Sequence, residues 1–312
     1  MRAAFAWLLA GALLAWTVLR LFGLERGWPL VPMLAFTPYV AVLAVLVAIV
    51  AATLGVWRAA FLAAVCAIAL VAVVLPRGLA DTAPPDAPGV RVRVLTVNLA
   101  GSAGSARAVV AAVKRERVDI LSVQELSPEA ARGLAVAGLG GVLSEQVLDV
   151  RPGFSGTGIY SWASVRRIAG PSGTRFAMAT AEARLSSGSV VQLVAVHPPA
   201  PTGPAPIRRW RHDLRALPPP SRSGPFRILA GDFNATLDHA ELRRLLDSGY
   251  RDAADDAGAG LHATYPNGRR TPPTVTIDHV LADRRARVRS ARVLTFGGTD
   301  HRAVLAELVL PN

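Results

Sequence analysis

Three long runs of apolar residues without a single charge lie near the start of the chain. They cover residues 3–19, 34–57 and 59–76. A helix needs roughly 17 to 25 mostly apolar residues to cross the hydrocarbon core of a bilayer. The pattern therefore predicts a membrane domain over residues 1–77 with three transmembrane helices. The first run could also be a cleaved secretory signal, but two further apolar runs follow closely and favour a retained helix.

The pattern of polar and apolar positions changes after the third run. Residues 78–89 are rich in proline, glycine and small residues, which is typical of an extended linker. From Val90, charged and apolar residues alternate and then give way to an apolar run, as in a strand that enters a core. We therefore expect a separate domain over residues 90–312.

Short apolar runs and helical patterns follow each other through this domain. Strands are expected at residues 90–97, 119–123, 190–196, 226–230, 275–281 and 303–310. Helices are expected after a capping Ser105, after Ser127-Pro128, over residues 208–217, and from a capping Asp238 to Ser248. Few connections are long enough to hold a crossover helix. This favours a mixed α/β sandwich over a doubly wound parallel sheet.

Composition supports a membrane-associated chain with basic character. Apolar residues make up 52% of it and the mean hydropathy is +0.36. The only cysteine, Cys66, lies in the third apolar run, which excludes a disulfide framework and a thiolate metal site. Of a net charge of +12, five arginines and three acids precede residue 90, which leaves +10 for residues 90–312. Such a domain attracts phosphate-bearing substrates or anionic lipid head groups, although arginine richness can equally reflect codon usage.

Acids, amides and imidazoles stand where several of the expected strands end, as at a site for water attack on phosphate. That reaction needs charge neutralisation on the phosphate, a positioned water and a stabilised leaving oxygen. Glu125 follows a buried strand, and magnesium prefers sparse oxygen ligation. We expect Glu125 to be the principal metal ligand, assisted by Asn98 and Asp300. Taken alone, Glu125 would read as a solvated loop residue.

Asp232 and Asn234 are two residues apart after a predicted strand, so they project to the same side of an extended segment. Asp232 is expected to orient the attacking water, and Asn234 to donate hydrogen bonds to a phosphate oxygen. Gly231 allows a close approach of the backbone. An Asx-type turn is the alternative reading of these residues.

Histidines complete the candidate site. His301 is expected to act on the phosphate as an acid or base, oriented by Asp278, whereas His279 should point to the opposite face and be structural. His197 ends an apolar strand and is a candidate phosphate contact or proton donor to the leaving group. Asn98 is expected to bond the metal-ligating carboxylate or the phosphate, with a turn-forming role as the alternative.

Together these residues resemble the endonuclease/exonuclease/phosphatase superfamily, which includes DNase I-like nucleases and several phosphatases. The resemblance covers about residues 90 to 310. The motifs that carry it are Thr96-Val97-Asn98, Val123-Gln124-Glu125, Gly158-Ile159-Tyr160-Ser161, Val196-His197, Gly231-Asp232-Phe233-Asn234, Thr264-Tyr265-Pro266, Ile277-Asp278-His279 and Thr299-Asp300-His301.

The resemblance implies a DNase I-like four-layer α/β sandwich with two packed mixed sheets, preceded here by the three transmembrane helices. It also implies a Mg²⁺ or Mn²⁺ ion on Glu125 and hydrolysis of phosphate ester bonds. Two features depart from the usual pattern. Ala100 stands where many of the nucleases carry a second polar or acidic residue, which puts a second metal site in doubt, and prolines follow His197.

Three functions are compatible with the sequence. The first is a membrane-anchored phosphoesterase that hydrolyses a phosphate ester or pyrophosphate near the bilayer, with a lipid-linked substrate. The second is a membrane-proximal nuclease, and the third a non-catalytic binding module. The chain resembles multi-pass members of the bacterial cell membrane, whose domain is generally extracytoplasmic. The distribution of arginines around the helices leans weakly towards the cytoplasm instead.

Overall fold

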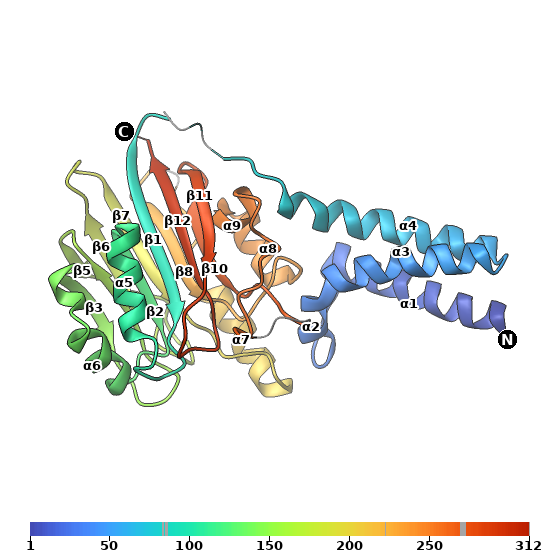
Figure 1. Ribbon diagram of the computed structural model, residues 1–312, viewed down its shortest axis with the longest axis horizontal. Coiled ribbons are helices and arrows are strands. Elements are labelled where there is room, and N and C mark those ends of the chain that lie inside the picture. The colour runs from blue at the N-terminus through green and yellow to red at the C-terminus, as the bar shows by residue number, and fades with distance from the viewer. Residues whose placement is uncertain (83, 85–86, 222, 269–272, 312) are drawn as a thin grey trace.

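Two parts of different character make up the molecule: a bundle of long helices and an α/β body (Figure 1). The computed structural model describes residues 1–82, 84, 87–221, 223–268 and 273–311. The helices project from one side of the body, and the N-terminus lies at their far end (Figure 1).

The bundle contains the three apolar helices expected from the sequence. α1 covers Arg2–Phe22, α3 covers Thr37–Thr53 after the short α2 (Leu30–Met33) and η1 (Leu34–Phe36), and α4 covers Trp57–Val74 and continues into η2 (Leu75–Gly78). By length and composition the candidate spans are Arg2–Phe22, Leu30–Thr53 and Trp57–Gly78. Small buried residues such as Ala44 and Ala63 line the helix contacts, which lets the backbones approach closely.

The first sheet of the α/β body contains both chain ends of that body. It is built from β1 (Val90–Asn98), β2 (Ile120–Gln124), β3 (Glu145–Asp149), β4 (Thr157–Ser161), β11 (Arg287–Leu294) and β12 (Ala303–Leu310). The strand order is β11-β12-β1-β2-β4-β3. β1 and β2 are parallel, and the other pairs are antiparallel, so the sheet is mixed.

The second sheet has the same size and a similar mixture of directions. It is built from β5 (Val165–Arg167), β6 (Thr180–Arg184), β7 (Val190–Val196), β8 (Phe226–Asp232), β9 (Tyr250–Asp252) and β10 (Asp278–Asp283). The strand order is β5-β6-β7-β8-β10-β9. Only β7 and β8 form a parallel pair among these described strands.

Alternating side chains of the central strands enter separate cores. Val94 packs between the two sheets, whereas its neighbour Leu95 packs outward under α5 (Ala106–Glu116) and α6 (Pro128–Val136). On the other side, α7 (Pro204–Ala216) and α8 (Ala240–Asp247) cover the second sheet through Trp210 and Leu245. The short η3 (Leu139–Gly141) and α9 (Ala253–Asp256) complete the body. The arrangement confirms the predicted four-layer sandwich of two mixed sheets.

Several element ends differ from the sequence predictions. The third helix of the body begins at Pro204 instead of residue 208, since prolines suit a first helical turn. Ser105 occupies the expected N-cap position of α5, but its side chain forms no capping hydrogen bond. Val275 lies ahead of β10 and pairs with Tyr265 in an isolated bridge.

Asp238 does not cap α8 as predicted, because His239 occupies that position. Its buried carboxylate instead binds two arginines of the helical bundle. Arg20 Nε lies 2.5 Å from Oδ1, and Arg77 Nη1 lies 2.8 Å from Oδ2. These contacts, 218 and 161 residues apart in sequence, fasten the bundle to the α/β body.

The loop between the first two long helices also enters the body. Val31 of α2 is fully buried in the outer core of the second sheet, beside Trp210 and Leu242. Its carbonyl lies 2.9 Å from Nε2 of His239, and the Glu25 carboxylate accepts a hydrogen bond from the backbone N–H of Ala240. The bundle and the body therefore share one packed core.

Candidate active site

The predicted polar residues gather at one edge of the two packed sheets. The parallel pairs β1/β2 and β7/β8 end there, and β10 and β12 begin there because they run antiparallel to their neighbours. Asp278 is the register partner of Asp232 across β10 and β8. The side chains carried to this edge are those of Asn98, Glu125, His197, Asp232, Asn234, Asp278 and His301.

The Asn98 amide connects the two sheets. Its Nδ2 donates hydrogen bonds to Oε1 of Glu125, at 3.1 Å, and to Oδ2 of Asp232, at 3.2 Å. Its Oδ1 accepts a hydrogen bond from the backbone N–H of Ala100 at 2.9 Å. The two carboxylates therefore lie within reach of one amide group, although they come from different sheets.

The backbone around these carboxylates is unusual. A Cβ atom on Gly231 would lie 2.0 Å from the carbonyl oxygen of Val196, so only glycine permits the pairing of β7 and β8 at this point. Glu125 has a φ of 54° and Asn234 a φ of 47°. Left-handed backbone is unfavourable for a glutamate and tends to occur at functional sites.

Asp232 and Asn234 form the turn that was the alternative reading of the sequence. Oδ1 of Asp232 accepts a hydrogen bond from the backbone N–H of Asn234 at 2.8 Å. The turn does not remove the two residues from the site. Oδ2 of Asp232 faces Asn98, and the Asn234 amide donates to the carbonyl of Pro198 at 3.1 Å.

His301 forms a pair with Asp278. Its Nδ1 lies 2.9 Å from Oδ2 of Asp278, while its Nε2 faces Oδ2 of Asp232 at 3.7 Å. The ring of Tyr265 lies against the imidazole, with the ring centres 4.8 Å apart. Thr264 holds Asp278 in place, because its hydroxyl oxygen accepts a hydrogen bond from the Asp278 backbone N–H.

His197 lies near both carboxylates. Its Nε2 is 3.9 Å from both Oε1 of Glu125 and Oδ2 of Asp232. The ring is buried, and Nδ1 has no hydrogen-bond partner among the residues that the structure describes. The half-buried ring of Phe176 covers it at 5.1 Å between ring centres. The histidine is therefore fixed mainly by packing.

Burial and neighbouring charges shift the pKa values of these groups in different directions. Burial raises the pKa of Asp232 to about 7, although the positive charge of His301 opposes the shift. Burial alone would lower the pKa of His301, but the Asp278 and Asp232 carboxylates raise it to about 10. Burial and the charge of His301 lower the pKa of His197 to about 3. At neutral pH, His301 is thus protonated and His197 is neutral.

Two sets of residues could hold a metal ion. The predicted set is Glu125, Asn98 and Asp300. Burial raises the pKa of Glu125, the hydrogen bond from Asn98 opposes the shift, and the negative charge of the exposed Asp300 adds to it. The second set, Asp232, Asp278 and His301, offers ligand atoms within 4.8 Å of one another.

The donor atoms of the two sets differ. The second set includes a histidine, which must be neutral to ligate a metal and is paired with Asp278 here. The carboxylates of Glu125 and Asp300 are hard oxygen donors beside solvent, which suits Mg²⁺ with several retained waters. Glu125, Asn98 and Asp300 would hold such an ion and would leave the pair of His301 and Asp278 intact.

Two further contacts of the site were not predicted from the sequence. Phe176 carries no motif that would have marked it as the cover of His197. Thr299 donates a hydrogen bond from its hydroxyl to the Asn98 carbonyl at 2.7 Å and so ties the His301 loop to β1. His279 is structural, as expected: it is buried on the other face of β10, with Nδ1 2.5 Å from Asp252 and Nε2 2.8 Å from the carbonyl of Ala235.

The model of the Endonuclease/Exonuclease/phosphatase family matches residues 95–301, which is most of the α/β body and includes every residue of the site. The chain belongs to this family. The match confirms the resemblance drawn from the strand-end motifs. No curated protein matches the sequence.

Solved structures of Endonuclease/Exonuclease/phosphatase proteins are similar to the α/β body. An endonuclease/exonuclease/phosphatase from Beutenbergia cavernae aligns with a TM-score of 0.56 and 16% identity, over 71% of this chain and 72% of its own. Truncated TDP2 from Caenorhabditis elegans aligns with a TM-score of 0.54 and 17% identity, over 70% of this chain and 97% of its own. TDP2 from D. rerio, complexed with a single-strand DNA product, aligns with a TM-score of 0.52 and 17% identity, over 70% of this chain and 98% of its own. At these identities the likeness establishes the shared fold.

Proposed function

We propose that this chain is a membrane-anchored, metal-dependent phosphoesterase that hydrolyses a phosphate ester or pyrophosphate by water attack. The observation that carries the proposal is the convergence of Glu125, Asp232 and His301 at one edge of the sheets. Members of the family are generally phosphoester hydrolases that use divalent metals, which supports this reading. A Mg²⁺ or Mn²⁺ ion on Glu125, Asn98 and Asp300 would neutralise charge on the phosphate.

Asp232 is the proposed proton acceptor. Its pKa of about 7 suits a general base at neutral pH. Hydrogen bonds from Asn98 and from the backbone of Asn234 fix its carboxylate, so that it can orient a water and take its proton. The water oxygen then forms a bond to phosphorus while the bond to the leaving oxygen breaks. The side-chain amide of Asn234 is proposed to contact a phosphate oxygen.

His301 is the proposed proton donor to the leaving oxygen. Asp278 holds the imidazolium in one orientation and keeps it charged, while Nε2 faces the site. His197 is neutral, so we assign it a hydrogen bond to the phosphate and not the transfer of a proton. This choice decides between the two roles expected for His197 from the sequence.

The substrate is proposed to carry its phosphate at the membrane surface. The helical bundle confines the site to the vicinity of the bilayer, where lipid-linked phosphates are abundant and nucleic acid is scarce. The net charge of +10 over residues 90–312 and the likeness to a DNA-bound TDP2 favour nucleic acid as a second candidate.

We further propose a division into a membrane domain at residues 1–77, a linker at 78–89 and a catalytic domain at 90–312. The chain would be a multi-pass protein of the cell membrane with the catalytic domain outside the cytoplasm. Alkaline phosphatase fused to the C-terminus is active only outside the cytoplasm. If that fusion is inactive and a reporter that works only in the cytoplasm is active at the same position, the catalytic domain lies in the cytoplasm and the proposed orientation is wrong.

The activity is tested with the full-length protein in detergent or nanodiscs. Bis(4-nitrophenyl) phosphate, single-stranded and duplex DNA, and lipid phosphates are each assayed with Mg²⁺ and with a chelator. We expect metal-dependent hydrolysis that Glu125→Gln abolishes, together with Mn²⁺ binding weakened by more than about tenfold. DNA cleavage without lipid turnover would favour the nuclease, and equal rates for the variant and the original protein would favour a non-catalytic module.

A further inference from the structure

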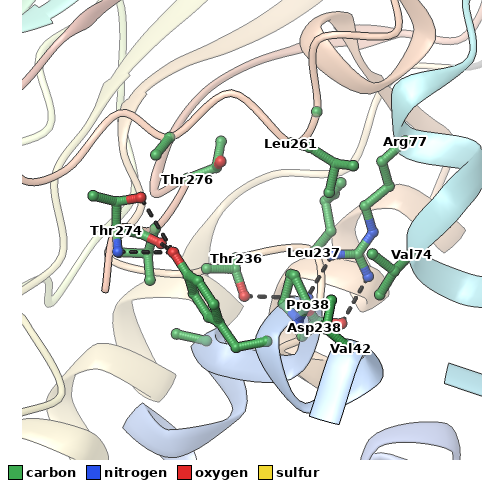
Figure 2. A pocket seen from close by; sticks show the side chains of 15 residues that line it. Pro38, Val42, Val74, Arg77, Thr236, Leu237, Asp238, Leu261, Thr274 and Thr276 are labelled. Carbon is green, nitrogen blue, oxygen red and sulfur yellow. Dashed lines mark hydrogen bonds and ion pairs between the residues drawn. The ribbon is translucent and has the colours of Figure 1, made fainter. Parts of the chain in front are cut away.

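A cavity of about 330 Å³ lies where the helical bundle meets the α/β body. Its size is near the lower end of the roughly 300–1,000 Å³ that small-molecule sites have. The bundle contributes Pro38 and Val42 from α3 and Val74 from α4, and the body contributes Leu237 and Leu261 (Figure 2). The lining is mainly apolar.

The polar groups of the cavity are largely bound to each other. Arg77 and Asp238 form the ion pair that fastens the two parts (Figure 2). The hydroxyl of Tyr39 lies 2.8 Å from the carbonyl of Thr274. A polar ligand would have to break these contacts, whereas a hydrocarbon chain would not. The chemistry of the cavity therefore favours an apolar occupant.

Two apolar residues of the cavity lining, one from the bundle and one from the body, are exposed. Val42 is 63% exposed and Leu261 is 42% exposed, so apolar side chains stand uncovered on both sides of the opening. Val42 lies near the start of α3 and Val74 at the end of α4, which are the ends nearest the body. The cavity thus lies at the end of the bundle that meets the α/β body.

Three segments of the cavity wall continue directly into the active site. Thr236 is two residues from Asn234, Ala263 is two residues from Tyr265, and Thr276 is two residues from Asp278. Two residues span at most about 7 Å. The lining of the cavity therefore lies beside the candidate active site.

We propose that the cavity holds a hydrocarbon chain of the substrate, which is a membrane lipid with a phosphate-bearing head group. The inference rests on the proposed phosphoesterase function and specifies its substrate class. With the chain in the cavity, the head group would lie close to Asp232 and His301. The bundle thus takes part in substrate recognition in addition to anchoring the enzyme.

Matched tryptophan substitutions on α3 test the proposal in the full-length protein. Val42→Trp narrows the cavity, and Ile49→Trp is the control: Ile49 lies two turns away on the same helix and is 56% exposed. The substrates are dioleoyl and dihexanoyl phosphatidic acid. Each buried methylene contributes a factor of about four to binding, so Val42→Trp should lower kcat/KM for the long-chain lipid by at least about tenfold and leave the short-chain lipid unchanged. Ile49→Trp should change neither, and equal rates for all three proteins on the long-chain lipid would overturn the proposal.

A binding experiment separates failure of this inference from failure of the proposed activity. A phosphatidic acid with a diazirine at the end of one chain is crosslinked to the Glu125→Gln variant in nanodiscs, and the adducts are mapped by mass spectrometry. We expect adducts at the segments around Val42 and Leu261, absent after Val42→Trp and retained after Ile49→Trp. If the adducts are localised but the original protein hydrolyses no phosphate ester, the proposed activity is rejected and the lipid site is retained. Adducts spread evenly over the exposed faces of the helices would reject the cavity as a lipid site.

Discussion

The separation in pKa between Asp232 and His301 has one structural origin. Both groups are buried, but His301 also faces the carboxylate of Asp278, whereas Asp232 faces the amide of Asn98. Burial therefore raises the pKa of the acid, while the paired carboxylate outweighs burial at the imidazole. A base and an acid are thus available side by side at neutral pH.

This separation predicts the pH dependence of the reaction. The base must be deprotonated and the acid protonated, so kcat/KM should rise as the pH passes about 7 and fall as it passes about 10. Asp232→Asn should remove the lower limb and reduce kcat by roughly 10²- to 10⁴-fold. The measurement is hydrolysis of bis(4-nitrophenyl) phosphate from pH 5 to 11. A flat profile would show that neither group takes part in proton transfer.

Asp278→Asn should move the upper limb of that profile. Without the carboxylate, burial lowers the pKa of His301, and the loss of activity at high pH should begin roughly one to three pH units earlier. Asp283→Asn is the matched control, because Asp283 lies at the other end of β10 and pairs with Arg285. An upper limb at the same pH in both variants would contradict the role of Asp278.

For single residues, the sequence predicts well which side chains come together, and it predicts poorly what surrounds them. Glu125, Asp232 and His301 were expected at one site because each stands next to a predicted strand end. The contacts of Phe176 and Thr299 could not be predicted, because both lie in loops whose paths depend on tertiary packing. The neutral state of His197 also depends on burial, which a single motif does not reveal.

At the level of elements, the contact between β7 and β8 sets the position of Asp232. Val196 and Gly231 are register partners in this parallel pair, and the next residue of each strand carries a side chain of the site. The strand pairing therefore fixes the distance between His197 and Asp232. A small change at Gly231 would be transmitted directly to the catalytic carboxylate.

Gly231→Ala should destabilise the fold and impair catalysis together. The added Cβ would lie 2.0 Å from the Val196 carbonyl oxygen, so the strands must separate. We expect a loss of at least roughly 1–3 kcal/mol, seen as a lower Tm by circular dichroism of the protein in detergent. Gly140→Ala is the control, because nothing lies within 4 Å of a Cβ added there. Equal melting temperatures of the two variants would mean that the strands adapt without strain.

Apolar runs predicted the central strands, whereas the short strands β3, β5 and β9 have no such run, and the helix starts depended on contacts from distant parts of the chain. Residues 190–196 and 303–310 were expected as strands and are β7 and β12. Aspartate is a residue type that often caps helices, but the carboxylate of Asp238 binds two arginines of the bundle instead. Local sequence could not reveal partners that lie more than 150 residues away.

For the whole molecule, Asp238 is the central contact between the bundle and the body. Burial would raise the pKa of this carboxyl, but Arg77 and Arg20 hold it below its usual value. The ion pairs are buried on both sides, so neither partner can turn to solvent when the other is removed. The position of the bundle relative to the α/β body depends on this group.

Asp238→Ala should loosen the junction without altering the catalytic residues themselves. Removing one partner of a buried ion pair costs about 3–5 kcal/mol. We expect faster hydrogen exchange in α2 and α8 and a lower Tm. Glu182→Ala is the control, because its partner Arg166 is exposed and such pairs contribute less than about 1 kcal/mol. Unchanged exchange at the junction would show that apolar packing alone holds the two parts together.

The burial of Val31 under the second sheet limits which substitutions the N-terminal segment can accept. A segment that served only as an anchor could be replaced by any other hydrophobic segment, but a segment that supplies part of the core of the α/β body cannot. Substitutions at Val31 must be matched by substitutions at Trp210 or Leu242, which line the same space. Relatives should therefore inherit these positions as a set. A chimera that combines one relative's N-terminal helices with another's α/β body should fold only when the whole set is transferred.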